Sequence, residues 1–273
     1  KVKGIMMILK EGGNVFKTEP DKELITQRIA TPDVHPTIQF IEKITGLTFD
    51  EEDWLGTTGK KEHPDGEFEK NSSGDLDLNT DANKISKQEL IAKLSAWLKS
   101  QGIPEQEIMN KGRTKQDGWI ADVGDQVHFR TPIDGTDQKG FVQTDFMFTN
   151  NPDFQRGAKR GGTQEYGGKY RAILLSALAR GRGYKFSPKF GIVDPNNGDA
   201  VVTNDWTKGI PEILLGKGAK EEDTYTVESM IAFIKNDPNY EELVGPFKDT
   251  IEKDGLTLPE SRELSRIKEL AGL

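Results

Sequence analysis

Hydrophobic residues recur along this chain with two periods. Short stretches alternate apolar and polar residues, as half-buried strands do, whereas longer stretches repeat apolar residues every three or four positions, as amphipathic helices do. The expected strands lie at residues 5–9, 74–78, 127–131, 140–148 and, as a hairpin, 191–202. The expected helices lie at residues 33–46, 86–102, 172–184 and, as two or three pieces, within 223–273. This mixture predicts an α+β fold.

Local start signals support two of these helices. Ser86 is followed three residues later by Glu89, which is the spacing of a capping box, and an apolar stripe begins at Leu90. Asp33 is the expected cap of the first helix. Pro36 is expected in its first turn, where a missing N–H costs no hydrogen bond.

The C-terminal part, 223–273, has the pattern of a helical packing unit. Thr226 is the expected N-cap of one helix, and this helix is expected to end at the Asp-Pro pair whose second residue is Pro238. A second apolar stripe runs from Tyr240 to Ile251, and Pro259 is the expected start of a third helix. The apolar stripes predict a hydrophobic core here and no ligand site.

The stretch 74–78 carries the first candidate chemistry. Strand periodicity puts its two leucines on one face and Asp75 and Asp77 on the other. Two carboxylates this close repel each other unless a cation lies between them, and Mg²⁺ binds carboxylate oxygens together with substrate phosphates. A calcium loop is excluded, because that loop needs Gly and Glu where this chain has Thr80 and Ser86. The pattern indicates either a divalent-metal site or a solvated edge strand.

A further carboxylate lies in the expected strand 140–148. Alternation places Asp145 on the same face as Gln143, in the middle of an aromatic-rich strand. An unpaired buried carboxylate is costly, so Asp145 needs a partner. That partner is either a metal ion shared with Asp75 and Asp77 or a lysine in a salt bridge.

Composition narrows the possible chemistry. The 273 residues are 34% hydrophobic and 30% charged, which is typical of a soluble globular protein, and no apolar run reaches the ~18 residues of a transmembrane helix. The sequence as given shows no signal-peptide pattern. The lack of cysteine excludes thiolate metal sites and is consistent with a cytoplasmic protein. His35, His63 and His128 are isolated in the sequence, so a metal is expected to be held by oxygen.

Charge is distributed unevenly along the chain. The net charge of −8 argues against a surface coated for nonspecific DNA binding. Residues 155–189, however, hold nine basic residues and one acidic residue, Glu165. This segment predicts either a local site for phosphates or a solvated charged helix face.

Small residues precede the paired carboxylates, and a hydrophobic strand with one carboxylate follows them. The order is Gly56-Thr57 after an apolar residue, the Asp75 and Asp77 strand, a helix, and the Asp145 strand. This order resembles the DNA polymerase beta-like nucleotidyltransferase superfamily. In that family three carboxylates on a small mixed sheet hold two divalent ions, Mg²⁺ or Mn²⁺, which bind a nucleoside triphosphate and activate the attacking hydroxyl. The resemblance implies a palm-like mixed sheet with Asp75, Asp77 and Asp145 as catalytic residues and metal ligands.

The same resemblance implies that the loop before the carboxylates contacts an NTP or dNTP. Its candidate nucleotide-binding residues are Gly56, Thr57, Thr58 and Lys60. The chain departs from the family in having Thr57 where Ser or Gly is usual. It departs also in a longer spacing before the carboxylates, which an insertion at 61–70 would explain.

A looser likeness extends to about residue 216 and resembles the palm-to-thumb passage of family-X polymerases. There, an aromatic-x-Gly segment lines the nucleotide sugar and a helix with an arginine supports it. By this likeness Tyr166 and Gly167 border the nucleotide and Arg171 lies near it. The alternatives are an ordinary packed aromatic for Tyr166 and a surface helix residue for Arg171.

Four segments follow from these inferences. They are an N-terminal extension (1–32), a palm-like catalytic domain (33–155), a thumb-like subdomain (156–222) and C-terminal helices (223–273). The sequence also resembles uncharacterised phage-encoded nucleotidyltransferases, which implies a cytoplasmic location, in the host if the protein is phage-encoded, and no membrane association.

The expected function is a metal-dependent transfer of a nucleotide from an NTP or dNTP to a hydroxyl acceptor, with release of pyrophosphate. The acceptor is a nucleic-acid 3′ end, a protein hydroxyl or a small molecule. One alternative is a non-catalytic binding or phage structural protein with the same fold. Another is a metal-dependent nuclease, which would leave the Gly56-Thr57 loop unexplained.

Overall fold

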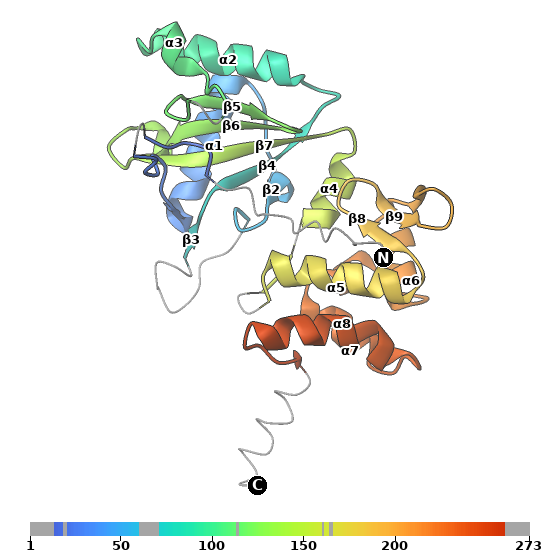
Figure 1. Cartoon of the computed structure of the whole chain (residues 1–273). Helices are drawn as coiled ribbons and strands as arrows, with labels where there is room; N and C mark the ends of the chain where they lie inside the picture. Colours follow the sequence, from blue (N-terminus) through green and yellow to red (C-terminus); the bar gives the residue numbers. More distant parts are fainter. Residues whose placement is uncertain are drawn as a thin grey trace, which may run out of the picture. The chain divides into compact units, whose positions relative to one another are not determined.

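The chain forms two compact units, Lys1–Asn150 and Asn151–Leu273. The computed structural model describes residues 14–18, 21–59, 71–112, 115–159, 161–163 and 166–259 (Figure 1). The strand expected at 5–9, Lys60, and the helix expected beyond Pro259 lie outside these residues. The expected segment boundaries after 155 and 222 both fall inside the second unit.

The first unit is built on a five-stranded mixed sheet in the order β2-β4-β7-β6-β5. Strands β4 and β7 run parallel, and the other neighbours run antiparallel. A smaller sheet pairs β1 with β3. The strands are β1 (Ile29–Ala30), β2 (Trp54–Leu55), β3 (Ser72–Ser73), β4 (Leu76–Asp81), β5 (Ile120–Val123), β6 (Gln126–Pro132) and β7 (Phe141–Thr149). The predictions of an α+β fold and of strands at 127–131 and 140–148 are confirmed.

The helices of this unit begin where local chemistry favours them. They are α1 (Thr31–Thr45), α2 (Lys87–Ser100) and α3 (Glu105–Ile108), with the 3₁₀ turns η1 (Glu51–Asp53) and η2 (Ile133–Gly135). The capping box predicted at Ser86 and Glu89 is present at the start of α2. The prediction that Asp33 caps α1 is wrong, because Ala30 is the N-cap and no side chain caps the helix. A proline already lies at the first or second position of α1, so Pro36 falls inside the helix and not in its first turn.

Helices α1 and α2 cover one face of the sheet and enclose the core. Alternation along the strands points one set of side chains to this face, as predicted for the leucines of 74–78. Each such side chain contributes about 1.5 to 3 kcal/mol when fully buried. The core includes Leu76, Leu78, Phe129 and Phe146 from the sheet and Ile38, Ile41, Leu90, Leu94 and Leu98 from the helices. The polar residues of β4 and β7 are thereby placed on the opposite face.

The second unit combines helices with a three-stranded antiparallel sheet, β10-β9-β8, around a single hydrophobic core. The hairpin predicted at 191–202 and the cap predicted at Thr226 are both present. The elements are α4 (Pro152–Lys159), α5 (Gly168–Gly181), β8 (Lys185–Ser187), β9 (Gly191–Asp194), β10 (Ala200–Thr203), α6 (Gly209–Leu215), η3 (Glu221–Thr224), α7 (Val227–Ile234) and α8 (Tyr240–Lys253). No helix among the described residues of either unit is long and apolar enough to cross a membrane.

A buried arginine ties α4 and η3 to α5 within this unit. Arg171 is only 2% exposed, and its guanidinium donates to the carbonyl oxygens of Gly157, Ala158 and Thr224 at 2.8, 3.0 and 2.7 Å. The guanidinium also lies over the ring of Trp206, 5.3 Å from its centroid. Burial lowers the pKa of Arg171 to about 10, so the side chain stays charged at neutral pH.

We expect Arg171→Met to destabilise the second unit by at least about 3 kcal/mol, because three buried carbonyl oxygens lose their donor. Urea unfolding followed by circular dichroism measures this change. Arg180→Met, at an exposed position of the same helix, is the matched control and should change stability by less than about 0.5 kcal/mol. Equal effects of the two substitutions would refute the structural role of Arg171.

Candidate functional site

Three carboxylates meet on the polar face of the first unit's sheet. Parallel pairing places Asp77 of β4 directly beside Asp145 of β7, and Asp75 precedes β4 on the same face. One carboxylate oxygen of each residue lies within 4.8 Å of the others. Asp145 is buried at 2% exposure, whereas Asp75 and Asp77 are half-buried. The structure thus brings together the three carboxylates that the alternation pattern singled out.

This arrangement suits a hard divalent cation. Carboxylates at such a separation repel one another, and their charge is best offset by a cation that takes oxygen ligands. Mg²⁺ and Mn²⁺ have this preference, and both commonly share their remaining positions with phosphates. Asp75, Asp77 and Asp145 could therefore hold one or two such ions.

The loop after β2 is fitted closely to Asp77. Gly56 has a positive φ of +56°, and a β-carbon at this position would lie 2.9 Å from Oδ2 of Asp77. The backbone N–H of Asp77 donates to the hydroxyl of Thr58 at 2.8 Å. The hydroxyls of Thr57 and Ser73 are hydrogen-bonded to each other. Residues 56–58 are thus fastened to the strand that carries the paired carboxylates.

These contacts also define what Thr58 does. Its side chain is 2% exposed, and its own N–H donates to the carbonyl of Leu55 at 3.0 Å. Its hydroxyl therefore holds the loop on β4, while its backbone N–H closes the turn back to β2. The predicted nucleotide contacts of Gly56 and Thr57 stay predictions, and that of Lys60 falls outside the described residues.

Asp145 has a partner that sequence reasoning missed. His128 on β6 stands directly opposite Asp145 on β7, and Nδ1 of the imidazole lies 2.7 Å from Oδ1 of the carboxylate. Both side chains are buried. The prediction of a salt bridge between Asp145 and a lysine is therefore wrong. Among the described contacts, the partner of Asp145 is a histidine. Alternation within 127–131 could have placed His128 on this face, but only the cross-strand register puts it beside Asp145.

The same face bears further polar contacts on either side of the carboxylates. Asn79, two residues beyond Asp77, donates from its side-chain amide to Oδ1 of Asp53 at 3.0 Å. Gln143, two residues before Asp145, accepts a hydrogen bond from the backbone of Val15 at 2.9 Å. The N-terminal segment therefore contacts this face at Gln143, and the carboxylates lie between these two flanking contacts.

The remaining predicted nucleotide contacts lie in the second unit, where they have structural roles. Tyr166 is 1% exposed, and its hydroxyl donates to the carbonyl of Thr257. Burial raises the pKa of this phenol. Gly167 is the N-cap of α5, and Arg171 is the buried arginine described above. Arg171 is thus not the surface residue considered as the alternative, while nucleotide binding by all three residues stays a prediction.

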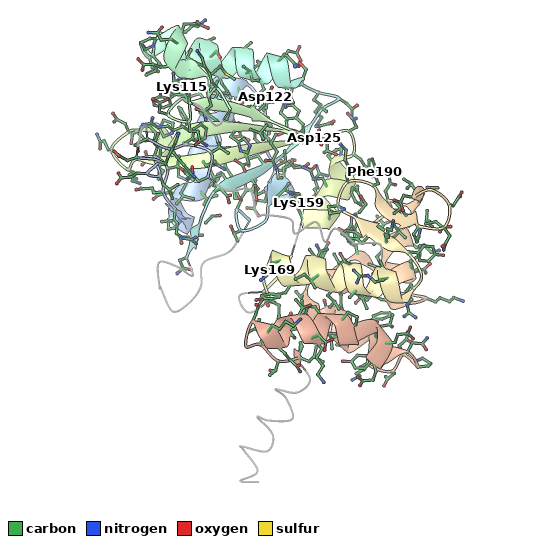
Figure 2. The ribbon with its side chains drawn as sticks, viewed as in Figure 1. Lys115, Asp122, Asp125, Lys159, Lys169 and Phe190 are labelled. Carbon is green, nitrogen blue, oxygen red and sulfur yellow. The ribbon has the colours of Figure 1, made fainter. Side chains whose placement is uncertain are left out.

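The basic segment 155–189 is partly compensated within its own unit. Besides Arg171, four of its basic side chains pair with carboxylates, as Lys169 does with Asp254 at 2.9 Å (Figure 2). Hydrogen bonds from Lys169 and Tyr170 lower the pKa of Asp254. The other pairs are Arg156 with Asp153, Arg182 with Asp237, and Lys185 with Asp199. These pairs favour the charged-surface interpretation of this segment over a phosphate site.

No protein-family model, curated protein or solved structure matches this chain. The resemblance to nucleotidyltransferases therefore stays a prediction from the motifs in the sequence.

We expect Thr58→Val to lower the free energy of unfolding by about 1 to 2 kcal/mol, because the buried N–H of Asp77 loses its acceptor while the side-chain shape is nearly kept. Thr58→Ser retains the hydroxyl and should be clearly less destabilising. Urea unfolding of the two variants measures the difference. If the valine variant is as stable as the serine variant, the loop is not held to β4 by this hydrogen bond.

Proposed function

We propose that this protein is a metal-dependent nucleotidyltransferase, which moves a nucleotide from an NTP or dNTP to a hydroxyl acceptor with release of pyrophosphate. The observation that carries the proposal is the set of three carboxylate oxygens from Asp75, Asp77 and Asp145 within 4.8 Å of one another. The loop at Gly56, fastened against Asp77, supports it. A metal site alone does not require a glycine whose backbone approaches a ligand carboxylate so closely.

Each residue has a distinct role in this proposal. Asp75 and Asp77 would hold both ions, and Asp145 chiefly the one at the acceptor hydroxyl. Bound divalent ions lower the pKa of an attacking hydroxyl and offset the charge of the leaving pyrophosphate. Gly56 and Thr57 would approach the triphosphate through their backbone, since a glycine leaves room for phosphate oxygens beside the peptide. Thr58 keeps this loop at a fixed distance from the carboxylates.

The acceptor is proposed only as a hydroxyl group. The basic segment is the sequence feature that favours a nucleic-acid end, and four of its nine basic side chains pair with carboxylates within the second unit. Protein and small-molecule hydroxyls are therefore equal candidates, and an assay must offer all of them.

Incubation with Mg²⁺ or Mn²⁺ and each labelled NTP and dNTP, with DNA, RNA, protein and small-molecule acceptors, tests the proposal. Asp77→Asn should reduce label transfer by at least about 100-fold, or ~2.7 kcal/mol of transition-state stabilisation. Asp122→Asn is the matched control, because Asp122 lies in the same unit on the β5–β6 hairpin, paired with Lys87 (Figure 2). Full activity of Asp77→Asn would refute the assignment. Absence of transfer by the wild type to any acceptor would favour a binding or structural role.

Gly56→Ala should weaken Mn²⁺ binding by about tenfold, because the added β-carbon displaces the Asp77 carboxylate. Gly124→Ala is the matched control, since its φ is +57° and a β-carbon there meets nothing within 4 Å. Both alanines suffer the strain of a positive φ, roughly 1 to 2 kcal/mol. Only the first should change metal affinity, as measured by electron paramagnetic resonance of free Mn²⁺. Equal affinities would show that Gly56 does not shape the metal site.

A further inference from the structure

The buried pair of His128 and Asp145 is a feature that the proposed chemistry does not yet use. The two residues face each other across β6 and β7, and each is 2% exposed. On the other side of His128, the residue directly opposite on β5 is Ala121, whose side chain has no polar atom. The contact at 2.7 Å therefore joins a buried imidazole to the most buried of the three carboxylates.

The direction of this hydrogen bond follows from the chemistry of its two ends. A carboxylate that binds a metal ion is ionised and can only accept hydrogen bonds, so in such a site Nδ1 of His128 is the donor. The imidazole can make this donation while uncharged, whereas a lysine or arginine would bring a full positive charge against Asp145. A cation at Asp145 would then compete with any metal ion for the same carboxylate. A neutral donor fixes the carboxylate and leaves its negative charge for the metal.

We propose that His128 is a positioning residue, which holds the carboxylate of Asp145 through Nδ1–H in the orientation that binds the metal ion. This inference rests on the proposed metal-dependent function. Strands β6 and β7 are joined by six other residue pairs, so the sheet does not depend on this contact. Buried polar pairs are often no more stabilising than apolar residues of similar size, which leaves orientation of the carboxylate as the role of this pair.

Two variants of nearly the same shape separate positioning from packing. The amide nitrogen of Asn in His128→Asn lies close to the place of Nδ1 and can donate to Asp145, whereas His128→Leu cannot. His128→Leu should bind Mn²⁺ about 10- to 100-fold more weakly than the wild type. The Mn²⁺ affinity of His128→Asn should stay within roughly threefold of that of the wild type, because this variant keeps a hydrogen bond to the metal-binding carboxylate. Thermal unfolding shows whether both variants are folded.

The outcomes distinguish this inference from the proposed function. If His128→Leu binds Mn²⁺ as tightly as the wild type, the positioning role is refuted and the metal site stands. If the two variants lose affinity equally, packing and not the Nδ1 donor is responsible, and the inference fails. If the wild type itself binds no Mn²⁺, the metal site and the role of His128 fail together.

Nuclear magnetic resonance of the unaltered protein provides a test that needs no folded variant of His128. Imidazole ¹⁵N signals should show His128 as the Nδ1–H tautomer, and addition of Mg²⁺ should shift them while those of the exposed His35 stay unchanged. Signals are assigned by elimination with His35→Asn and His63→Asn. An Nε2–H tautomer would overturn the proposal, because Nδ1 could not then donate to Asp145. Mg²⁺ binding that leaves the His128 signals unmoved would also overturn it.

Discussion

The parallel register of β4 against β7 is the constraint on which the candidate site depends. Asp77 lies beside Asp145 only because Leu78 lies beside Phe146, and that pair is fixed by burial against α1 and α2. A shift of one residue would turn the carboxylates of one strand into the core and expose its apolar side chains. The hydrophobic core therefore sets the positions of the charged groups on the opposite face.

The two units contain buried charge in different ways. In the first, Asp145 lies beside a histidine and two further carboxylates on one face of the sheet. In the second, the charge of Arg171 is met by three backbone carbonyls and a tryptophan ring. Every fold contains backbone carbonyl groups, and their dipoles can stabilise a buried cation nearby. Clustered carboxylates repel one another, which is why the proposed function places a cation among them, whereas Arg171 is held by groups of its own unit.

Local signals in the sequence were sufficient for much of the fold. The capping box at Ser86, the cap at Thr226 and the alternation in 140–148 depend on neighbours a few residues away, and all three are present. The prediction for the start of α1 is wrong, because Asp33 is a good cap by residue type but the helix begins at Thr31. Sequence propensity predicts that a helix is present more securely than it predicts the residue at which the helix begins.

Features that depend on contacts between distant parts of the chain could not be predicted from local sequence patterns. The pairing of His128 with Asp145 requires the register of two strands, and the neutralisation of Lys169 requires a carboxylate from the end of α8. From sequence alone the charge run at 155–189 fits a phosphate site as well as a solvated face, and only the structure shows that four of its nine basic side chains pair with carboxylates. The convergence of Asp75, Asp77 and Asp145 was one of two alternatives left by alternation and burial, and the family resemblance favoured it.

The order of the strands has a consequence for how the molecule is made. Strand β7 is the last of its sheet along the chain, yet it lies at the centre, between β4 and β6. Until β7 has been synthesised, β4 and β6 have no common neighbour. The strands of this sheet can then form only the separate pairs β2–β4 and β5–β6. Such non-local pairing is slow because the intervening chain must first be brought together at an entropic cost. Closure of the sheet and assembly of the carboxylates are therefore one folding event, and a nascent chain that lacks β7 has neither the core nor the site.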